Sequence, residues 1–171
     1  MLMHWVRPLL TGCAIGAAAV AIGWFLPSVG LEGSAAGMLQ PNYQLPELID
    51  RFVPEVLTGL QMAFVTAAAS ALCLFIVFAL VTRLVARPTG PGEVGRGWRV
   101  ALWWVLLLAC AGAAYGAVAY FLSSQVATVD AAVATRIALL VMIVAAATFW
   151  VMSVVGVERM MRPAVFLASM R

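Results

Sequence analysis

The chain has 171 residues, of which 65% are hydrophobic and only 10% are charged. Soluble domains are about 25% charged, so the composition excludes an ordinary soluble domain and predicts an integral membrane protein. The formal net charge of +3 comes from ten basic residues, all of them Arg. They are not clustered as in a nucleic-acid-binding protein, so membrane lipid is an expected partner and nucleic acid is not.

The first apolar run covers about residues 8–26. At 1.5 Å per residue it just crosses a hydrocarbon core about 30 Å thick. Trp5 and Trp24 flank it as an aromatic belt does, and Pro27 is expected to end the helix. A cleaved secretory signal peptide is the alternative, because small residues follow at 34–36. The run is longer than a usual signal core, which favours a retained helix.

A polar connection at residues 28–54 separates the first run from the second. Within it, apolar residues recur at helical spacing from Leu48 to Val53, and Pro46 suits the first turn of a helix. Residues 46–56 therefore predict a short amphipathic helix on the membrane surface, with an ordinary structured loop as the alternative.

The same amphipathic stretch is followed by Leu57-Thr58-Gly59-Leu60 and then by an apolar helix. In this order residues 46–74 resemble the entry helix of ABC-transporter permeases of the amino-acid type. The resemblance implies a surface helix that leads into a membrane-spanning one. It covers less than a fifth of the chain, and no cytoplasmic coupling loop of the permease kind follows, so the predicted function does not depend on it.

Three further apolar runs follow, each long enough to span a bilayer: 57–81, 100–122 and 137–157. A loop rich in Pro and Gly, residues 82–99, separates the first two, and a short link containing Asp130 separates the last two. The chain is therefore predicted to be one membrane domain, residues 1–171. Its expected fold is an all-α integral membrane protein, a four-transmembrane-helix bundle with a short amphipathic helix in the first extracytoplasmic loop.

The arginines predict the topology of these four crossings. One side of the membrane holds eight of them: Arg7, Arg83, Arg87, Arg96, Arg99, Arg159, Arg162 and Arg171. The other side holds only Arg51 and Arg136. The positive-inside rule then places both termini and the 82–99 loop in the cytoplasm, and the 28–54 loop outside. The composition suggests the inner (plasma) membrane of a bacterium.

No ionisable residue lies near the centre of any run, which disfavours an ion pump or a coupled transporter. The candidate intramembrane polar contacts are Gln61, Thr66 and Ser70. Gln61 is the strongest candidate for a hydrogen bond to a neighbouring helix or subunit, with an interfacial position near the helix start as the alternative.

Two glycine pairs have the spacing of a close helix–helix contact. The first is Gly12 with Gly16, continued by Gly23, and the second is Gly112 with Gly116. Both are predicted to pack helices together. Each pair packs helices either within the bundle or between subunits. Small residues are so frequent in this chain that some glycine pairs with this spacing are expected by chance.

The sequence carries no phosphate loop, no zinc-protease motif and no nucleophile elbow. His4 is the only His, so a haem held by paired His ligands is not expected. The three cysteines, Cys13, Cys73 and Cys110, are scattered, which argues against a disulfide framework or a zinc site. Enzyme activity, a metal and a cofactor are all unexpected.

Three functions remain open. The first is a non-catalytic membrane subunit of a larger bacterial transport, secretion or respiratory complex, which binds other subunits or itself. The second is a small oligomeric transporter or channel lined by residues such as Gln61. The third is a scaffold or adaptor that binds a cytoplasmic partner or anionic lipid through a cytoplasmic basic loop: Arg83, Arg87, Arg96 and Arg99.

Overall fold

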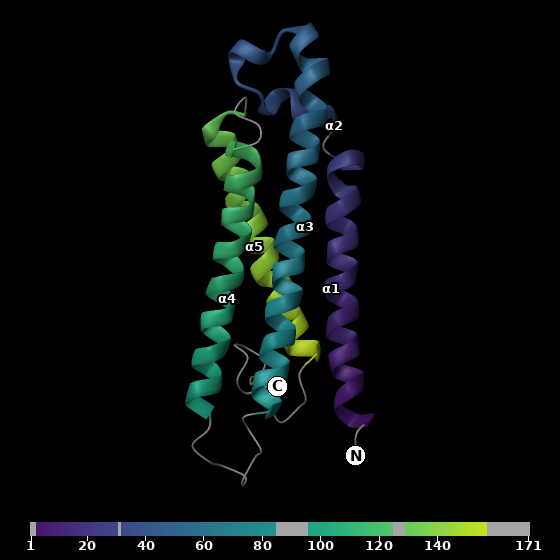
Figure 1. The fold of residues 1–171 in the computed structure, drawn as a ribbon, viewed down its shortest axis with the longest axis vertical. Coiled ribbons are helices and arrows are strands. Elements are labelled where there is room, and N and C mark those ends of the chain that lie inside the picture. Colours follow the sequence, from purple (N-terminus) through teal and green to yellow (C-terminus); the bar gives the residue numbers. More distant parts are fainter. Residues whose placement is uncertain (1–2, 31, 85–95, 125–128, 157–171) are drawn as a thin grey trace.

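The computed structural model describes residues 3–30, 32–84, 96–124 and 129–156 (Figure 1). Four long helices dominate it: α1 Met3–Gly30, α3 Pro46–Leu84, α4 Arg96–Val118 and α5 Ala131–Gly156. Each contains a segment long and apolar enough to cross a membrane. The predicted all-α class and four apolar spans are therefore confirmed, and they indicate a multi-pass membrane protein.

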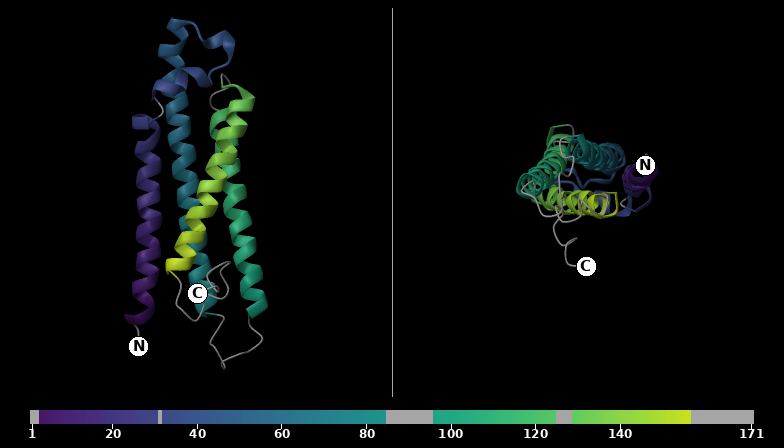
Figure 2. Two further views of the ribbon diagram at one scale, coloured as in Figure 1. Left: turned by 180° about the vertical axis from the view of Figure 1, so that it is seen from behind. Right: turned by 90° about the horizontal axis from the view of Figure 1, so that it is seen from below.

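Long helices that follow one another along the chain run antiparallel, and the bundle has a rhombic cross-section (Figure 2). α3 and α5 contact each other, and both contact α1 on one side and α4 on the other. α1 and α4 therefore occupy opposite corners. α1 thus packs against two other helices of the bundle.

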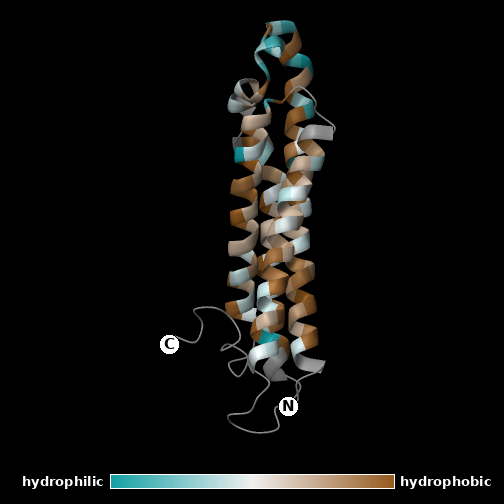
Figure 3. Cartoon of the chain, turned by 90° about the vertical axis from the view of Figure 1, so that its left-hand side faces the viewer, coloured by the Kyte–Doolittle hydropathy of each residue, from teal (hydrophilic) through white to brown (hydrophobic). Residues whose placement is uncertain are grey.

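The two ends of the bundle differ. The upper end, which carries α2 in Figure 1, holds the short elements α2 Glu32–Ala35, η1 Ala36–Met38, η2 Pro41–Tyr43 and η3 Ala119–Ser124. The lower end holds the start of α1 and the end of α5, as four crossings require. Figure 3 shows apolar residues along the helices and hydrophilic residues gathered at the upper extension.

The predicted separate amphipathic helix is not present in the structure. Residues 46–56 are helical, but they form the first turns of α3, a single helix of 39 residues with Pro54 inside it. Extending an existing helix adds one hydrogen bond per residue, whereas a second helix needs its own costly nucleus. At 1.5 Å per residue α3 is about 58 Å long, far more than a bilayer core of about 30 Å, so its upper turns stand outside the apolar layer.

Two further boundaries differ from the sequence prediction. Pro27 does not end α1, which continues to Gly30. A proline removes a single backbone donor, and membrane helices tolerate this where neighbouring groups satisfy the freed carbonyls. The last long helix begins at Ala131, earlier than predicted, because Asp130 is its N-cap. Its Oδ1 accepts hydrogen bonds from the backbone N–H groups of Ala132 (2.8 Å) and Val133 (3.3 Å).

The third apolar run is continued by η3, a π-helical segment with wider turns than α4. Its Leu122 is fully buried, together with Val118 one turn earlier. The core changes in character along its length. Small residues of α3, such as Ala63 and Ala67, fill its middle, and large rings such as Phe78 and Trp103 fill its lower part. Small side chains let the helices approach closely without a polar interior.

Candidate functional site: the glycine faces of α1 and α4

The glycine stripe of α1 is buried against α3 and α5. A Cβ added to Gly12 would overlap the ring of Phe75, and one added to Gly16 would lie 2.6 Å from Leu72 Cδ1 and 2.9 Å from Met152 Sδ. Real Cβ atoms essentially never lie at such distances, so a larger residue at either position requires the neighbouring side chains to shift. This stripe is therefore occupied within the chain.

Gly156, near the end of α5, completes the same contact and was not predicted. A Cβ on Gly156 would also overlap the Phe75 ring, and it would lie 3.1 Å from the Cα of Gly12. The Phe75 ring thus fits where two glycines from different helices face each other. Gly23 continues the stripe upward, where its Cβ would lie 3.3 Å from the backbone of Phe64. Sequence spacing could not reveal Gly156, because its partner is 144 positions away.

The glycine pair of α4 has the opposite environment. Gly112 and Gly116 are both exposed, and a Cβ added to either would meet no atom within 4 Å. The surrounding surface is apolar: Leu108 is 67% exposed and Val105 is 61% exposed. Within the described part of the chain, this face of α4 has the glycine spacing of a close helix contact, and no helix packs against it.

Gln61 joins α3 to α1 at the upper end of the first helix. Its Nε2 donates a hydrogen bond of 2.9 Å to the carbonyl oxygen of Trp24. Trp24 lies three residues before Pro27, where the helix has lost a backbone donor. The side-chain amide therefore binds the backbone of a neighbouring helix in a region where α1 is weakened.

The other two polar candidates lie elsewhere on α3. Thr66 is exposed, and the Ser70 hydroxyl donates to the Ala67 carbonyl of its own helix (2.8 Å). At 3.6 residues per turn Thr66 and Ser70 share one face, while Gln61 lies roughly opposite Ser70. The three residues do not form a common polar stripe.

At the lower end, Arg83 belongs to the last turn of α3 and Arg96 to the first turn of α4. Arg87 lies outside the described residues. The Arg99 side chain is half-buried, and its guanidinium lies 5.8 Å from the centre of the Trp98 ring. Three of the four arginines of the predicted basic loop are thus at one end of the bundle.

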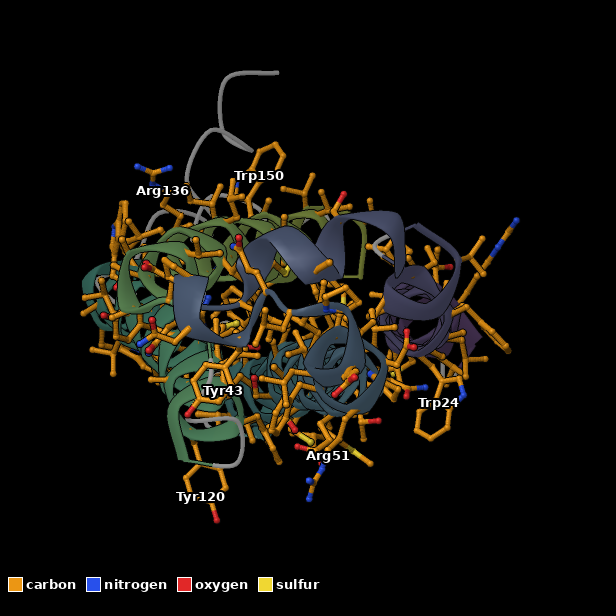
Figure 4. All side chains as sticks on the ribbon, turned by 90° about the horizontal axis from the view of Figure 1, so that it is seen from above. Trp24, Tyr43, Arg51, Tyr120, Arg136 and Trp150 are labelled. Carbon is orange, nitrogen blue, oxygen red and sulfur yellow. The ribbon has the colours of Figure 1, made fainter. Side chains whose placement is uncertain are left out.

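Aromatic and basic side chains project around the bundle. Viewed from above, Trp24, Tyr120, Trp150, Arg51 and Arg136 point outward from their helices (Figure 4). Amphipathic rings and long arginine side chains in such positions suit the boundary between lipid and water. The chain therefore presents a lipid-compatible surface on several sides.

Among the residues that the structure describes, no group of three or more His, Cys, Asp or Glu could hold a metal ion. Comparisons with protein families, with curated proteins and with solved structures find no match for this chain. No family match therefore supports the resemblance of residues 46–74 to ABC-transporter permeases. The functional argument depends on the chain's own geometry.

Proposed function

We propose that this protein is a non-catalytic integral membrane subunit of a larger bacterial membrane complex, and that it contacts its partner through the exposed glycine face of α4. The observation that supports the proposal is the contrast between the two glycine stripes. The stripe of α1 is filled by α3 and α5, whereas Gly112 and Gly116 face no other part of the described chain.

Glycine inside a helix costs roughly 0.5–1 kcal/mol relative to alanine, and no contact among the described residues offsets this cost for the exposed pair of α4. A close contact with a second transmembrane helix gives the pair a use, because glycines let two backbones approach. The partner is an apolar helix of another subunit or of a second copy.

Native electrophoresis of membranes dissolved in mild detergent tests this role. The wild-type chain is expected in a larger assembly with stoichiometric partner subunits identified by mass spectrometry. Gly112→Leu with Gly116→Leu is expected to release it. Ala17→Leu with Ala21→Leu is the matched control, since both are exposed small residues four apart on α1. A homogeneous homo-oligomer that conducts ions in liposomes would contradict the subunit role and favour a channel.

The orientation is part of the proposal: the lower end and both termini face the cytoplasm of a bacterial inner membrane. The distribution of Arg supports it. Cysteines placed at Asn42 and Gly97, both exposed and at opposite ends, test it in a background without the native cysteines. An impermeant thiol reagent added to intact cells is expected to label the first and not the second. The reverse pattern would refute this orientation.

The scaffold role has one supporting observation, the gathering of Arg83, Arg96 and Arg99 at the lower end. Anionic headgroups attract such a group by about 1 kcal/mol per Arg near the surface. Replacing all four loop arginines, Arg87 included, with Gln is expected to weaken binding to vesicles that contain anionic lipid. Unchanged binding would count against this role.

A further inference from the structure

The upper end of the bundle is covered by an irregular segment, residues 36–45, which we call the strap. It contains η1 and η2 and crosses from the α1 side to the start of α3. Leu39 in the strap is only 2% exposed. It belongs to the same buried cluster as Val56 of α3, Leu122 of η3 and Val129. A side chain carried by an irregular segment thus closes the upper end of the core.

The strap is attached firmly on its α3 side. The Tyr43 ring packs edge-on against Phe52, with 5.4 Å between the ring centres. The chain then enters α3 directly at Pro46. Internal hydrogen bonds hold the strap together as a unit: Gln44 Nε2 donates to the Leu39 carbonyl (3.2 Å), and the Tyr43 N–H donates to the Gln40 carbonyl (2.9 Å).

Its attachment to the α4–α5 side is concentrated in residues 38–40. The backbone N–H of Asp130 donates to the Met38 carbonyl (3.1 Å), and Gln40 Nε2 donates to the Val129 carbonyl (3.4 Å). Leu39 and Val129 form an isolated antiparallel bridge and not part of a continuing ladder. The Gln40–Val129 bond is only part-buried, and water competes for a hydrogen bond that it can reach.

The start of α5 does not depend on the strap. The Asp130 carboxylate caps α5 through Ala132 and Val133, and the Asp130 carbonyl accepts a hydrogen bond from the Ala134 N–H (2.9 Å). Release of Met38 and Gln40 therefore breaks no bond of that helix. Leu39 of the strap shares its buried cluster with Leu122 of η3, and π-helical segments are rare and frequently found at functional sites.

We infer that the strap is a clasp that opens at Met38–Gln40, hinges at the Tyr43–Phe52 contact, and reversibly joins the start of α3 to the residues just before α5. Opening withdraws Leu39 from the core and exposes the upper end of α4 and α5 without unfolding either helix. Local opening of this kind, at lower free energy than global unfolding, is detected by amide hydrogen exchange.

A cross-link across the clasp tests the inference. Residues opposite each other in an antiparallel bridge have Cα atoms about 4.5–5.5 Å apart, within the range that a disulfide spans. The Leu39→Cys/Val129→Cys protein is prepared in bilayer discs, with Cys13, Cys73 and Cys110 replaced by Ala. Amide exchange is then compared between its oxidised and reduced forms.

Oxidation is expected to slow exchange of the Asp130 amide about tenfold or more, because that amide is bonded to the strap. The Ala134 amide, bonded within α5, is expected to be unchanged. Equal exchange rates of the Asp130 amide in the two forms would overturn the inference. So would equal slowing of the Asp130 and Ala134 amides, since the strap would then open only together with α5.

A second variant makes the test independent of the cysteines. Gln40→Ala removes the side-chain bond to Val129 and is expected to accelerate exchange of the Asp130 amide about fivefold. Asn42→Ala is the control, since Asn42 is exposed in η2. If Gln40→Ala and Asn42→Ala leave the same exchange rate as the wild type, the clasp does not open at residues 38–40.

Discussion

The glycine faces of α1 and α4 have the same sequence spacing and opposite surroundings. On α1 the missing Cβ atoms make room for Phe75, Leu72 and Met152, whereas on α4 they leave an open surface. The same motif thus serves the interior of the bundle in one helix and its surface in another. The comparison teaches that a glycine pair predicts the close approach of another helix. Which helix fills that place depends on how the bundle packs.

The largest expected effect is that of Gly12→Leu. Its side chain would enter the space of the Phe75 ring, whose tip already contacts both Gly12 and Gly156. Overpacking of this kind costs about 3 kcal/mol in the free energy of unfolding. Reversible unfolding in mixed SDS micelles measures it.

A second substitution checks the cause. Phe75→Leu in the same protein removes ring atoms from the contact and is expected to restore part of the loss, as a positive coupling in a double-mutant cycle. If Gly12→Leu unfolds at the wild-type SDS concentration, α1 is not packed on Phe75 and the contrast between the two faces is lost.

An effect of opposite sign is expected on α4. Gly112→Ala with Gly116→Ala adds two Cβ atoms that meet no neighbour, and alanine favours the helix over glycine. The isolated chain is therefore expected to gain roughly 1–2 kcal/mol in the same unfolding measurement. A loss of stability in the purified monomer would mean that α4 packs against part of its own chain at this face.

The smallest expected effect is that of Gln61→Leu, which removes the hydrogen bond to the Trp24 carbonyl. Interhelical hydrogen bonds in membranes contribute about 0.6 kcal/mol on average, so a loss of that size is expected. Thr66→Val, on an exposed part of α3, serves as the control and is expected to be neutral. A loss as large as that of Gly12→Leu would show that Gln61, and not the glycine face, holds α1 to α3.

Two helix boundaries in the structure differ from those that the sequence predicted, because of packing between helices. Pro27 is a helix breaker in water, but α1 continues past it. Just before Pro27, Gln61 of α3 binds the Trp24 carbonyl, and Gly23 of α1 packs against the backbone of Phe64 in α3. Residues 46–56 are helical as the first turns of α3, and not as the short surface helix that their pattern predicted. Whether that helix joined the next one was not readable from periodicity, because Pro54 is compatible with either outcome.

The sequence by itself indicated a lipid bilayer as the environment of this protein. It also predicted the helical class and the approximate limits of the four spans. Those properties follow from local composition: long apolar runs must satisfy their backbone hydrogen bonds internally, and a helix does so within one segment. The tertiary structure alone decided which glycine face is filled, that Phe75 packs against both Gly12 and Gly156, and that Leu39 closes the upper end. Those properties depend on contacts between residues far apart in the chain. In an apolar bilayer, the fit between side chains selects such contacts more than their hydrophobicity does.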